Sequence, residues 1–205
     1  MLRVRDLAVA RGGRTVLEGV SFDVNPGEAL ILRGANGIGK TTLLRTLAGL
    51  QDPVAGDITF PEDEGAYASH ADAVKTALSV TENLTFWADI YGNPVPDMIW
   101  DAFDIADLRD RSAGTLSAGQ KRRLGLARLG VIGRKVLFLD EPTVSLDGFS
   151  VRLFTNFIRT EHLAKGGVAV IATHIDLGLS APTLELDTYA ASDRPARSSS
   201  DEAFL

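Results

Sequence analysis

Apolar and polar residues alternate along the beginning of the chain, as they do in strands with one buried face. Residues 2–10 follow this alternation closely, and residues 16–24 follow it more loosely. A turn signal, Asn25-Pro26-Gly27, comes directly after the second run. The pattern therefore predicts a start made of two antiparallel strands.

Shorter, almost wholly apolar runs follow, and these are typical of strands that are covered on both faces. They lie at residues 29–32, 136–139 and 168–173. The spacing of leucines predicts a helix over residues 40–50, and a further helix over residues 149–163 separates the last two strands. Because strands that alternate with helices form parallel sheets, we expect the fold class to be α/β.

The middle of the chain has a different character, with aromatic and acidic residues at irregular helical spacing. We expect helices over residues 81–91 and 95–108, separated by a break at Gly92-Asn93-Pro94. Together they predict a small helical subdomain over residues 76–114.

The rest of the chain is expected to form a core and a tail. The core consists of residues 1–75 and 115–191, and within it a helix over residues 119–133 carries a basic cluster, Lys121-Arg122-Arg123. The tail, residues 192–205, is rich in serine and charge and has no periodicity, so we expect it to be disordered.

Composition narrows the possible functions. Of the 205 residues, 45% are hydrophobic, which excludes wholesale disorder. The net charge of −6 provides no basic field for a phosphate backbone, so we expect no nucleic-acid partner. No apolar run approaches the roughly 20 residues of a membrane-spanning helix. The absence of cysteine excludes disulfides and thiolate metal sites.

A glycine-rich segment between the strand at 29–32 and the helix at 40–50 matches the phosphate-loop pattern. In this pattern backbone N–H groups hold phosphates, a lysine reaches the terminal ones and a hydroxyl binds Mg²⁺. The alternative is a glycine-rich connection with a solvated lysine, but the position between strand and helix favours a phosphate site. The candidate nucleotide-binding residues are Gly34, Ala35, Asn36, Gly37, Ile38, Gly39, Lys40, Thr41 and Thr42.

Two adjacent carboxylates end the apolar run at residues 136–139. They would lie at the carboxyl edge of the sheet, where ligands of open α/β folds bind. Asp140 suits Mg²⁺, together with Thr41, because a hard cation prefers oxygen ligands. Glu141 then remains free to act as a base on water. The alternative, a turn that begins before Pro142, is weaker once the phosphate loop is present.

Two further candidates are weak when taken alone. Ser117 and Gly119 begin the basic helix and could form a second anion site, although ordinary helix starts have the same composition. His174 follows the last apolar strand, where a single histidine is more often structural. A second anion site indicates either a second nucleotide or a partner subunit whose nucleotide it covers.

Taken in order along the chain, these segments resemble ATP-binding cassette (ABC) ATPases. The resemblance spans roughly residues 1–187 and rests on residues 34–42, Leu116 to Gln120, residues 137–143, Ser145-Leu146-Asp147 and Thr173-His174. It implies a P-loop NTPase fold of the ABC type, with a mixed sheet, an antiparallel β start and a small helical insert. It also implies ATP and Mg²⁺ as cofactors and ATP hydrolysis as the activity.

The same resemblance implies a dimer of two copies of this chain with two ATP molecules between them. Glu141 would polarise the attacking water, His174 would contact the terminal phosphate and Asp147 would cross the dimer interface. Each ATP would lie between the phosphate loop of one subunit and three residues of the other, Ser117, Gly119 and Gln120.

Two positions depart from the family pattern. The aromatic residue that usually stacks on adenine is missing, and Arg11 near this place would either stack its guanidinium on the base or remain a solvated turn residue. The position of the usual glutamine is occupied by His70, which alters a contact to magnesium and water and could make this loop respond to pH.

Three further features bear on the subfamily: His70 with Lys75 five residues later, the short insert, and the expected lack of structure beyond His174. These features resemble the ATP-binding subunits of haem exporters in bacterial cytochrome c maturation. That likeness implies integral membrane permease partners and a peripheral location at the cytoplasmic face of the inner membrane. The cargo stays open between haem and the release of a haem carrier.

Other assignments stay open beside this one. Rival cargoes within the transporters are those of lipoprotein release, division-site and metal systems. A non-transport ABC ATPase would carry long coiled-coil insertions, and no heptad run is present. A nucleotide-gated regulator without activity would have little use for the full set of Lys40, Asp140, Glu141 and His174.

Overall fold

The computed structural model describes residues 1–69 and 71–192, and its centre is a parallel sheet of five strands. The strand order is β5-β6-β7-β3-β8, and every neighbouring pair is parallel. The carboxyl ends of all five strands therefore lie at one edge of the sheet. The strands are β3 (Ala29–Arg33), β5 (Gly65–Ala68), β6 (Val136–Asp140), β7 (Val168–Ala172) and β8 (Thr183–Glu185).

A second, antiparallel sheet has the order β2-β1-β4. Its strands are β1 (Leu2–Arg11), β2 (Arg14–Val24) and β4 (Ala55–Thr59). Gly12 and Gly13 join the first two strands with φ values of 58° and 78°, the left-handed conformation that a tight two-residue hairpin loop requires. The predicted antiparallel start is confirmed.

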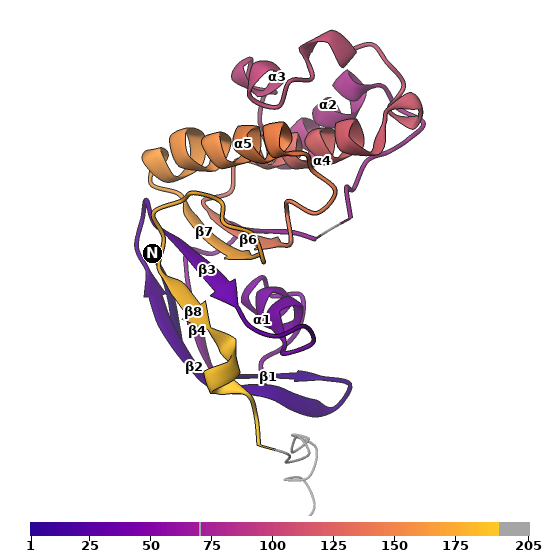
Figure 1. The fold of residues 1–205 in the computed structure, drawn as a ribbon. Coiled ribbons are helices and arrows are strands. Elements are labelled where there is room, and N and C mark those ends of the chain that lie inside the picture. Colours follow the sequence, from indigo (N-terminus) through magenta and orange to yellow (C-terminus); the bar gives the residue numbers. More distant parts are fainter. Residues whose placement is uncertain (70, 193–205) are drawn as a thin grey trace, which may run out of the picture.

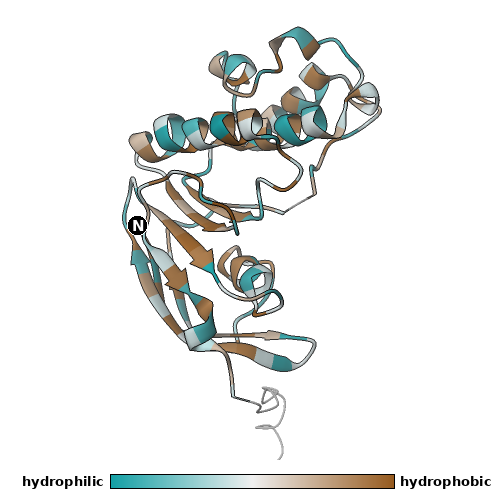
Figure 2. Ribbon diagram, in the orientation of Figure 1, coloured by the Kyte–Doolittle hydropathy of each residue, from teal (hydrophilic) through white to brown (hydrophobic). Residues whose placement is uncertain are grey.

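Helices cover both faces of the parallel sheet, as Figure 1 shows. On one face lie α1 (Lys40–Leu47) and the antiparallel sheet, and on the other lie α4 (Ala118–Ile132) and α5 (Gly148–Phe157). Successive residues of β3 enter the two cores in turn, Leu30 and Leu32 on the α1 side and Ala29 and Ile31 on the other. This double burial explains the continuous apolar runs, visible as brown strands in Figure 2.

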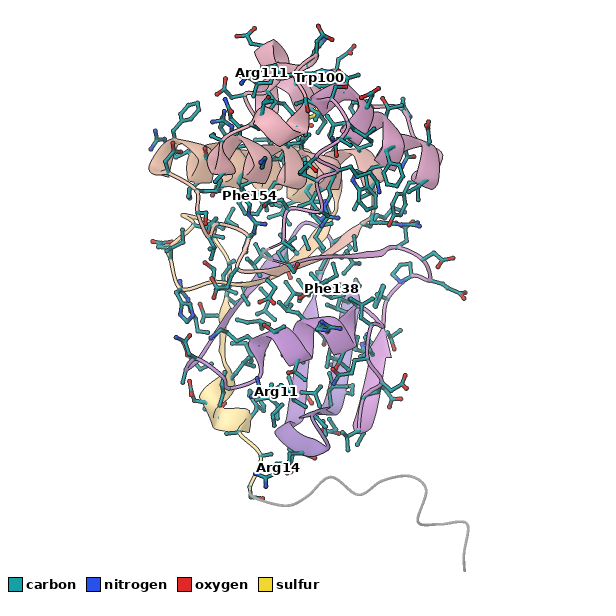
Figure 3. All side chains as sticks on the ribbon, turned by 90° about the vertical axis from the view of Figure 1, so that its right-hand side faces the viewer. Arg11, Arg14, Trp100, Arg111, Phe138 and Phe154 are labelled. Atoms are coloured by element: carbon teal, nitrogen blue, oxygen red, sulfur yellow. The ribbon has the colours of Figure 1, made fainter. Side chains whose placement is uncertain are left out.

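The remaining helices lie beyond α4 and α5, away from the sheet (Figure 1). They are α2 (Val80–Tyr91), α3 (Met98–Ala102) and the 3₁₀ turns Ala106–Leu108 and Ala113–Thr115. Figure 3 shows Trp100 of α3 in this part, well above Phe138 and Phe154, which lie in the two cores beside the sheet. The helix expected over residues 95–108 is shorter than predicted, because Asp104 adopts a φ of 50° and interrupts it.

Three strands, β4, β5 and β8, are absent from the sequence prediction. Each has five residues or fewer, too few to show a period. The expectation of no structure beyond His174 is wrong, because β8 forms an edge of the parallel sheet and the following turn, Leu186–Tyr189, buries Leu186 completely. The helix expected over residues 149–163 is regular only to Phe157 and continues as a π-turn over Ile158–His162.

The predicted division into core and helical subdomain stays a prediction, and the tail from residue 193 onwards lies outside the described residues. Within residues 1–69 and 71–192, no helix has the length and apolar character needed to cross a bilayer.

Candidate functional site

The glycine-rich loop connects β3 to α1, and its backbone needs glycine. Gly34 and Gly39 have φ values of 145° and 123°, in the left-handed region that side chains rarely allow. A Cβ at Gly34 would also lie 3.1 Å from the side chain of Ile38, and one at Gly39 would lie 3.2 Å from that of Leu17. The loop therefore brings its bare backbone to the N-terminus of α1, where N–H groups have no helical partners.

Lys40 is the first residue of α1, and its side chain folds back over this loop. Its Nζ donates hydrogen bonds to the carbonyl oxygens of Gly34 at 2.7 Å and Ala35 at 3.2 Å. The residue is only 8% exposed, so the ammonium group is held in place rather than free in water. A cation in this position can exchange its carbonyl contacts for phosphate oxygens.

Asp140 is the last residue of β6, and a tyrosine of the neighbouring strand supports it. The hydroxyl of Tyr67 in β5 donates a hydrogen bond to Asp140 Oδ2 over 3.1 Å. Burial, and after it the charge of Asp140, raises the pKa of Tyr67 to about 12, so the hydroxyl keeps its proton near neutral pH. Asp140 itself is buried, which makes this polar contact important for its orientation.

Glu141 follows in a left-handed conformation with a φ of 48°. Its N–H donates to the carbonyl oxygen of Ala172, the last residue of β7, over 2.9 Å. Its carboxylate Oε1 lies 3.2 Å from Nε2 of His174, two residues beyond the end of β7. Because β6 and β7 are parallel neighbours with Asp140 opposite Ala172, the sheet itself brings the two side chains together.

One cavity of about 200 Å³ collects most of the predicted site residues at the carboxyl edge of the sheet. They come from the tip of β1, the loop after β3 and the ends of β6 and β7. The cavity is lined by Arg11, Asn36, Gly37, Gly39, Lys40, Thr41, Thr42, Asp140, Glu141 and His174.

The chemistry of this cavity fits magnesium only together with a phosphate ligand. Thr41 and Asp140 line it with a hydroxyl and a carboxylate. Among residues 1–69 and 71–192 there is no group of three or more His, Asp or Glu side chains that could hold a metal unaided. Mg²⁺ often takes one or two carboxylates and completes its shell with water and substrate phosphates. Thr41 and Asp140 suit an ion that binds with the nucleotide.

Ser117, Gly119 and Gln120 do not line this cavity; they form the start of α4. Ser117 Oγ accepts from the N–H of Gln120, and Gln120 Oε1 accepts from the N–H of Ser117 at 3.0 Å, a capping box. Apart from adjacent residues and the backbone of its own helix, a Cβ at Gly119 would meet no atom of the described chain within 4 Å. This helix start is therefore open to contact from outside.

Asp147 caps α5 in a similar way. Its Oδ1 accepts from the N–H of Ser150 at 2.7 Å, and this hydrogen bond lowers the pKa of Asp147.

Arg11 lies exposed opposite Arg14 at the tip of the β1–β2 hairpin, as Figure 3 shows, and borders the cavity. His70 lies outside the described residues, so its role stays a prediction.

Three residues of this region were not assigned a role from the sequence. Tyr67 supports Asp140, and Asp187 Oδ1 accepts from the N–H of Ala35 in the glycine-rich loop over 3.4 Å. Arg122 donates to the carbonyl oxygen of Glu141 over 3.2 Å. All three contacts join residues far apart in the chain, and no local motif indicates them.

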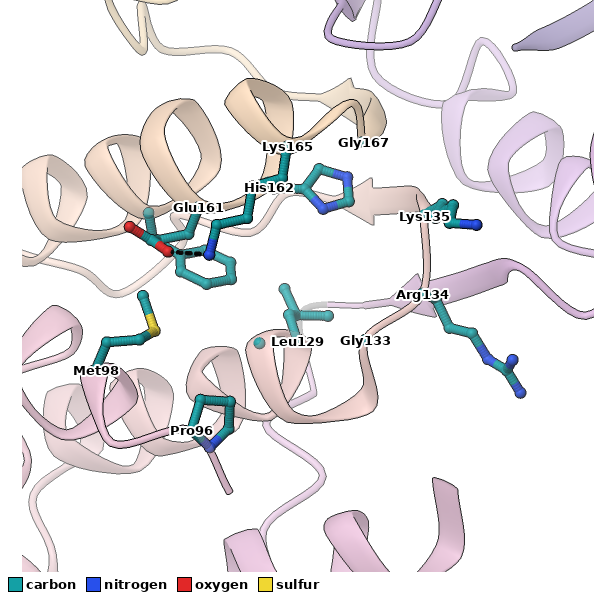
Figure 4. Close-up of a pocket in the computed structure, with 12 residues that line it drawn as sticks. Pro96, Met98, Leu129, Gly133, Arg134, Lys135, Glu161, His162, Lys165 and Gly167 are labelled. Carbon is teal, nitrogen blue, oxygen red and sulfur yellow. Dashed lines mark hydrogen bonds and ion pairs between the residues drawn. The ribbon is translucent and has the colours of Figure 1, made fainter. Parts of the chain in front are cut away.

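A second cavity, of about 310 Å³, lies between the C-terminal part of α4 and the turns that continue the chain after α5 (Figure 4). Lys135 and Gly167 line it, and each directly precedes a parallel strand, so this cavity is at the amino edge of the sheet. Its Lys165 is already paired with Glu161 at 2.7 Å. The cavity is thus separate from the glycine-rich loop.

Comparison with known proteins agrees with this geometry. A family model described as ABC transporter matches residues 17–144. The chain belongs to the ABC transporter family. ATP-binding domains of this family hydrolyse ATP, and the chain is accordingly an ATPase. Members generally act as dimers together with membrane permease subunits.

Individual relatives cover nearly the whole chain. The cytochrome c biogenesis ATP-binding export protein CcmA of Ruegeria pomeroyi is 60% identical over 195 residues, 95% of this chain and 94% of the relative. The protein of the same name from Paracoccus denitrificans is 61% identical over 194 residues, 94% of this chain and 92% of the relative. Among solved structures, an ABC transporter ATP-binding protein from Pyrococcus furiosus has a TM-score of 0.81 at 27% identity, covering 93% of this chain and 99% of that one.

Proposed function

We propose that this chain is the ATP-hydrolysing subunit of an export system that serves cytochrome c maturation. The observation that carries the proposal is the cavity at the carboxyl edge of the sheet, where Lys40, Asp140 and Glu141 meet beside the glycine-rich loop. The names of the relatives, which share about 60% of its residues, support the assignment to cytochrome c biogenesis.

In this proposal the loop and α1 hold the phosphates of ATP. The loop's N–H groups and Lys40 Nζ would contact the β- and γ-phosphates, and Thr41 with Asp140 would hold Mg²⁺. The metal, when bound, would neutralise charge on the phosphate oxygens. The aromatic residue that usually stacks on adenine is missing. Arg11 at the hairpin tip would supply its planar guanidinium as the stacking surface instead.

Hydrolysis follows from the pair formed by Glu141 and His174. Glu141 accepts a proton from water as the water oxygen attacks the γ-phosphorus, and the bond from that phosphorus to the bridging oxygen breaks to leave ADP and phosphate. His174, within 3.2 Å of Glu141, orients the carboxylate and contacts the terminal phosphate. Positioning and charge stabilisation are the main contributions in such a transfer.

The second half of each reaction site is proposed to come from a second copy of the chain. The open start of α4, with Ser117, Gly119 and Gln120, presents N–H groups and a hydroxyl to the γ-phosphate bound by the partner. The absence of described neighbours around Gly119 leaves room for such an approach. Asp147, at the start of α5, is proposed to cross the same interface.

We further propose that the dimer binds integral membrane permease subunits at the cytoplasmic face of the bacterial inner membrane. Haem, or the release of a haem carrier, is the proposed cargo step. The segment around His70 would link the nucleotide site to the permease. A pull-down of this chain from membranes should recover cytochrome c maturation proteins with it. Recovery of unrelated permeases alone would overturn the assignment to this subfamily.

The chemical part of the proposal is tested with Glu141→Gln. The variant keeps the shape of the side chain and leaves the phosphate loop unchanged, so it should bind ATP as tightly as the wild type while phosphate release falls by about 100-fold or more, to a low residual rate. It should also accumulate as an ATP-bound dimer in size-exclusion chromatography. Undiminished phosphate release would refute the assigned base.

A further inference from the structure

The candidate base has a backbone that its own side chain disfavours. Glu141 has a φ of 48°, and non-glycine residues keep such a conformation only when the surrounding structure determines it. Its N–H is fixed by the carbonyl oxygen of Ala172 over 2.9 Å. Its carbonyl oxygen, in the next peptide group, has a separate partner.

A buried arginine of α4 holds it. Arg122 is only 3% exposed, and its guanidinium donates to the carbonyl oxygen of Glu141 from Nη2 over 3.2 Å. It also donates to the carbonyl oxygen of Pro142, from Nε over 3.0 Å and from Nη2 over 2.8 Å. The planar guanidinium, with its several N–H donors in a fixed fork, thus holds two successive carbonyl groups, those of the candidate base Glu141 and of Pro142. A lysine ammonium group, with its single nitrogen, cannot make the same set of contacts.

The guanidinium is itself fixed from the other side. Its Nη1 donates to the carbonyl oxygen of Ser69 and to Oδ1 of Asp72, each over 3.2 Å. The same segment packs directly on the helix, since a Cβ at Gly125 would come within 2.4 Å of the carbonyl oxygen of Asp72. Arg122 therefore joins three parts: the helix that begins at Ser117, the turn that carries Glu141, and the segment on either side of position 70.

We propose that Arg122 is a positioning residue for ATP hydrolysis. It holds the backbone of Glu141 in its strained conformation, so that the carboxylate of Glu141 faces the cavity. This inference rests on the proposed role of Glu141 as the base. Arg122 contacts no nucleotide in this scheme; it acts through the carbonyl oxygens of Glu141 and Pro142. It also ties the geometry of the base to α4, whose first turn is proposed to contact the ATP of the partner subunit.

The test compares Arg122→Lys with Arg128→Lys in the full-length chain. Arg128 lies on the same helix and is partly buried, but its Nε bonds to the carbonyl oxygen of Gly125 and its guanidinium stacks over Trp87, away from Glu141. Arg122→Lys keeps the charge and loses the fork. We expect kcat to fall by about tenfold or more, because small displacements of a catalytic group slow the reaction strongly. ATP affinity, measured with a fluorescent analogue, should stay within about twofold of the wild type. Arg128→Lys should leave kcat unchanged.

Two further measurements separate this role from a merely structural one. Adding Arg122→Lys to Glu141→Gln should lower residual hydrolysis no further, because Arg122 acts through the group already removed. Thermal unfolding of Arg122→Lys and of the less conservative Arg122→Gln shows whether the fold survives. The inference is overturned if kcat is unchanged, if ATP affinity falls in parallel with kcat, or if the two changes add. Full activity of Glu141→Gln alone would instead overturn the base assignment, so the two failures are distinguishable.

Discussion

The hydroxyl of Tyr67 donates a hydrogen bond to Oδ2 of Asp140 over 3.1 Å, joining a strand that has no sequence signal to the candidate metal ligand. The tyrosine lies in β5, next to β6 in the sheet, so its side chain reaches the carboxylate from the neighbouring strand. Hydrogen bonds of this kind orient metal ligands and tune their basicity.

Tyr67→Phe should therefore weaken the response to magnesium. Removing the hydroxyl leaves a buried carboxylate without this donor, and losses at such supporting positions are about 10- to 100-fold in metal affinity or activity. The measurement is ATP hydrolysis titrated with Mg²⁺, where the half-saturating concentration should rise. Tyr91→Phe, which removes a hydroxyl in the helical part, is the control. An unshifted magnesium curve for Tyr67→Phe would argue against the support of Asp140.

Lys40→Gln should abolish tight ATP binding without unfolding the chain. The amide retains donors for the carbonyl oxygens of Gly34 and Ala35 but carries no charge to meet the phosphates. We expect affinity for a fluorescent ATP analogue to fall by about tenfold or more, since contacts of an ionised donor are roughly twice as strong as neutral ones. Lys135→Gln, an exposed lysine at the opposite edge of the sheet, should bind as the wild type does. Equal affinity in both variants would contradict the assigned loop.

Gly119→Val should leave the fold intact and impair the dimer. Apart from adjacent residues and the backbone of its own helix, a Cβ there meets no atom of the described chain, and valine has a higher helix propensity than glycine, so we expect no loss of melting temperature. Hydrolysis should fall strongly, because the added methyl groups would occupy the space proposed for the partner's phosphate.

Gly125→Ala provides the contrasting control for that experiment. Its Cβ would come within 2.4 Å of the carbonyl oxygen of Asp72, so this variant should lower the melting temperature. If Gly119→Val hydrolyses ATP at the wild-type rate, the start of α4 does not face a phosphate.

Acid should destabilise the fold through His162. Burial lowers the pKa of His162 below its ordinary value of 6.5, and Nε2 lies 3.0 Å from the carbonyl oxygen of Val168. Between the lowered pKa of the folded state and the ordinary value of 6.5, the unfolded chain binds more protons at His162 than the folded chain does. The stability contributed by neutral His162 is therefore complete above pH 6.5 and is lost as the pH falls below it.

The measurement is the melting temperature of the wild type and of His162→Asn between pH 8 and pH 5, a range chosen to span the ordinary histidine pKa of about 6.5. The variant should melt lower at pH 8, since it loses packing against Gly167. Its melting temperature should also depend less on pH. Parallel curves for the two proteins would assign the acid sensitivity to other groups.

The sequence by itself determined the architecture of the nucleotide site. The apolar runs of β3, β6 and β7 show their double burial directly, and the glycine spacing between Gly34 and Lys40 has few other structural uses. The order of the motifs along the chain pointed to the ABC family, which the comparisons show. These signals are local, because each depends on residues close together in the chain.

Only the tertiary structure decided how the site is supported. Tyr67, Arg122 and Asp187 reach the site from β5, α4 and the turn after β8, and two of those three elements are too short to have a period. Their contacts span from 19 to 152 positions of sequence. Such pairs are selected by the packing of the whole chain, and a single sequence carries no local pattern that records them.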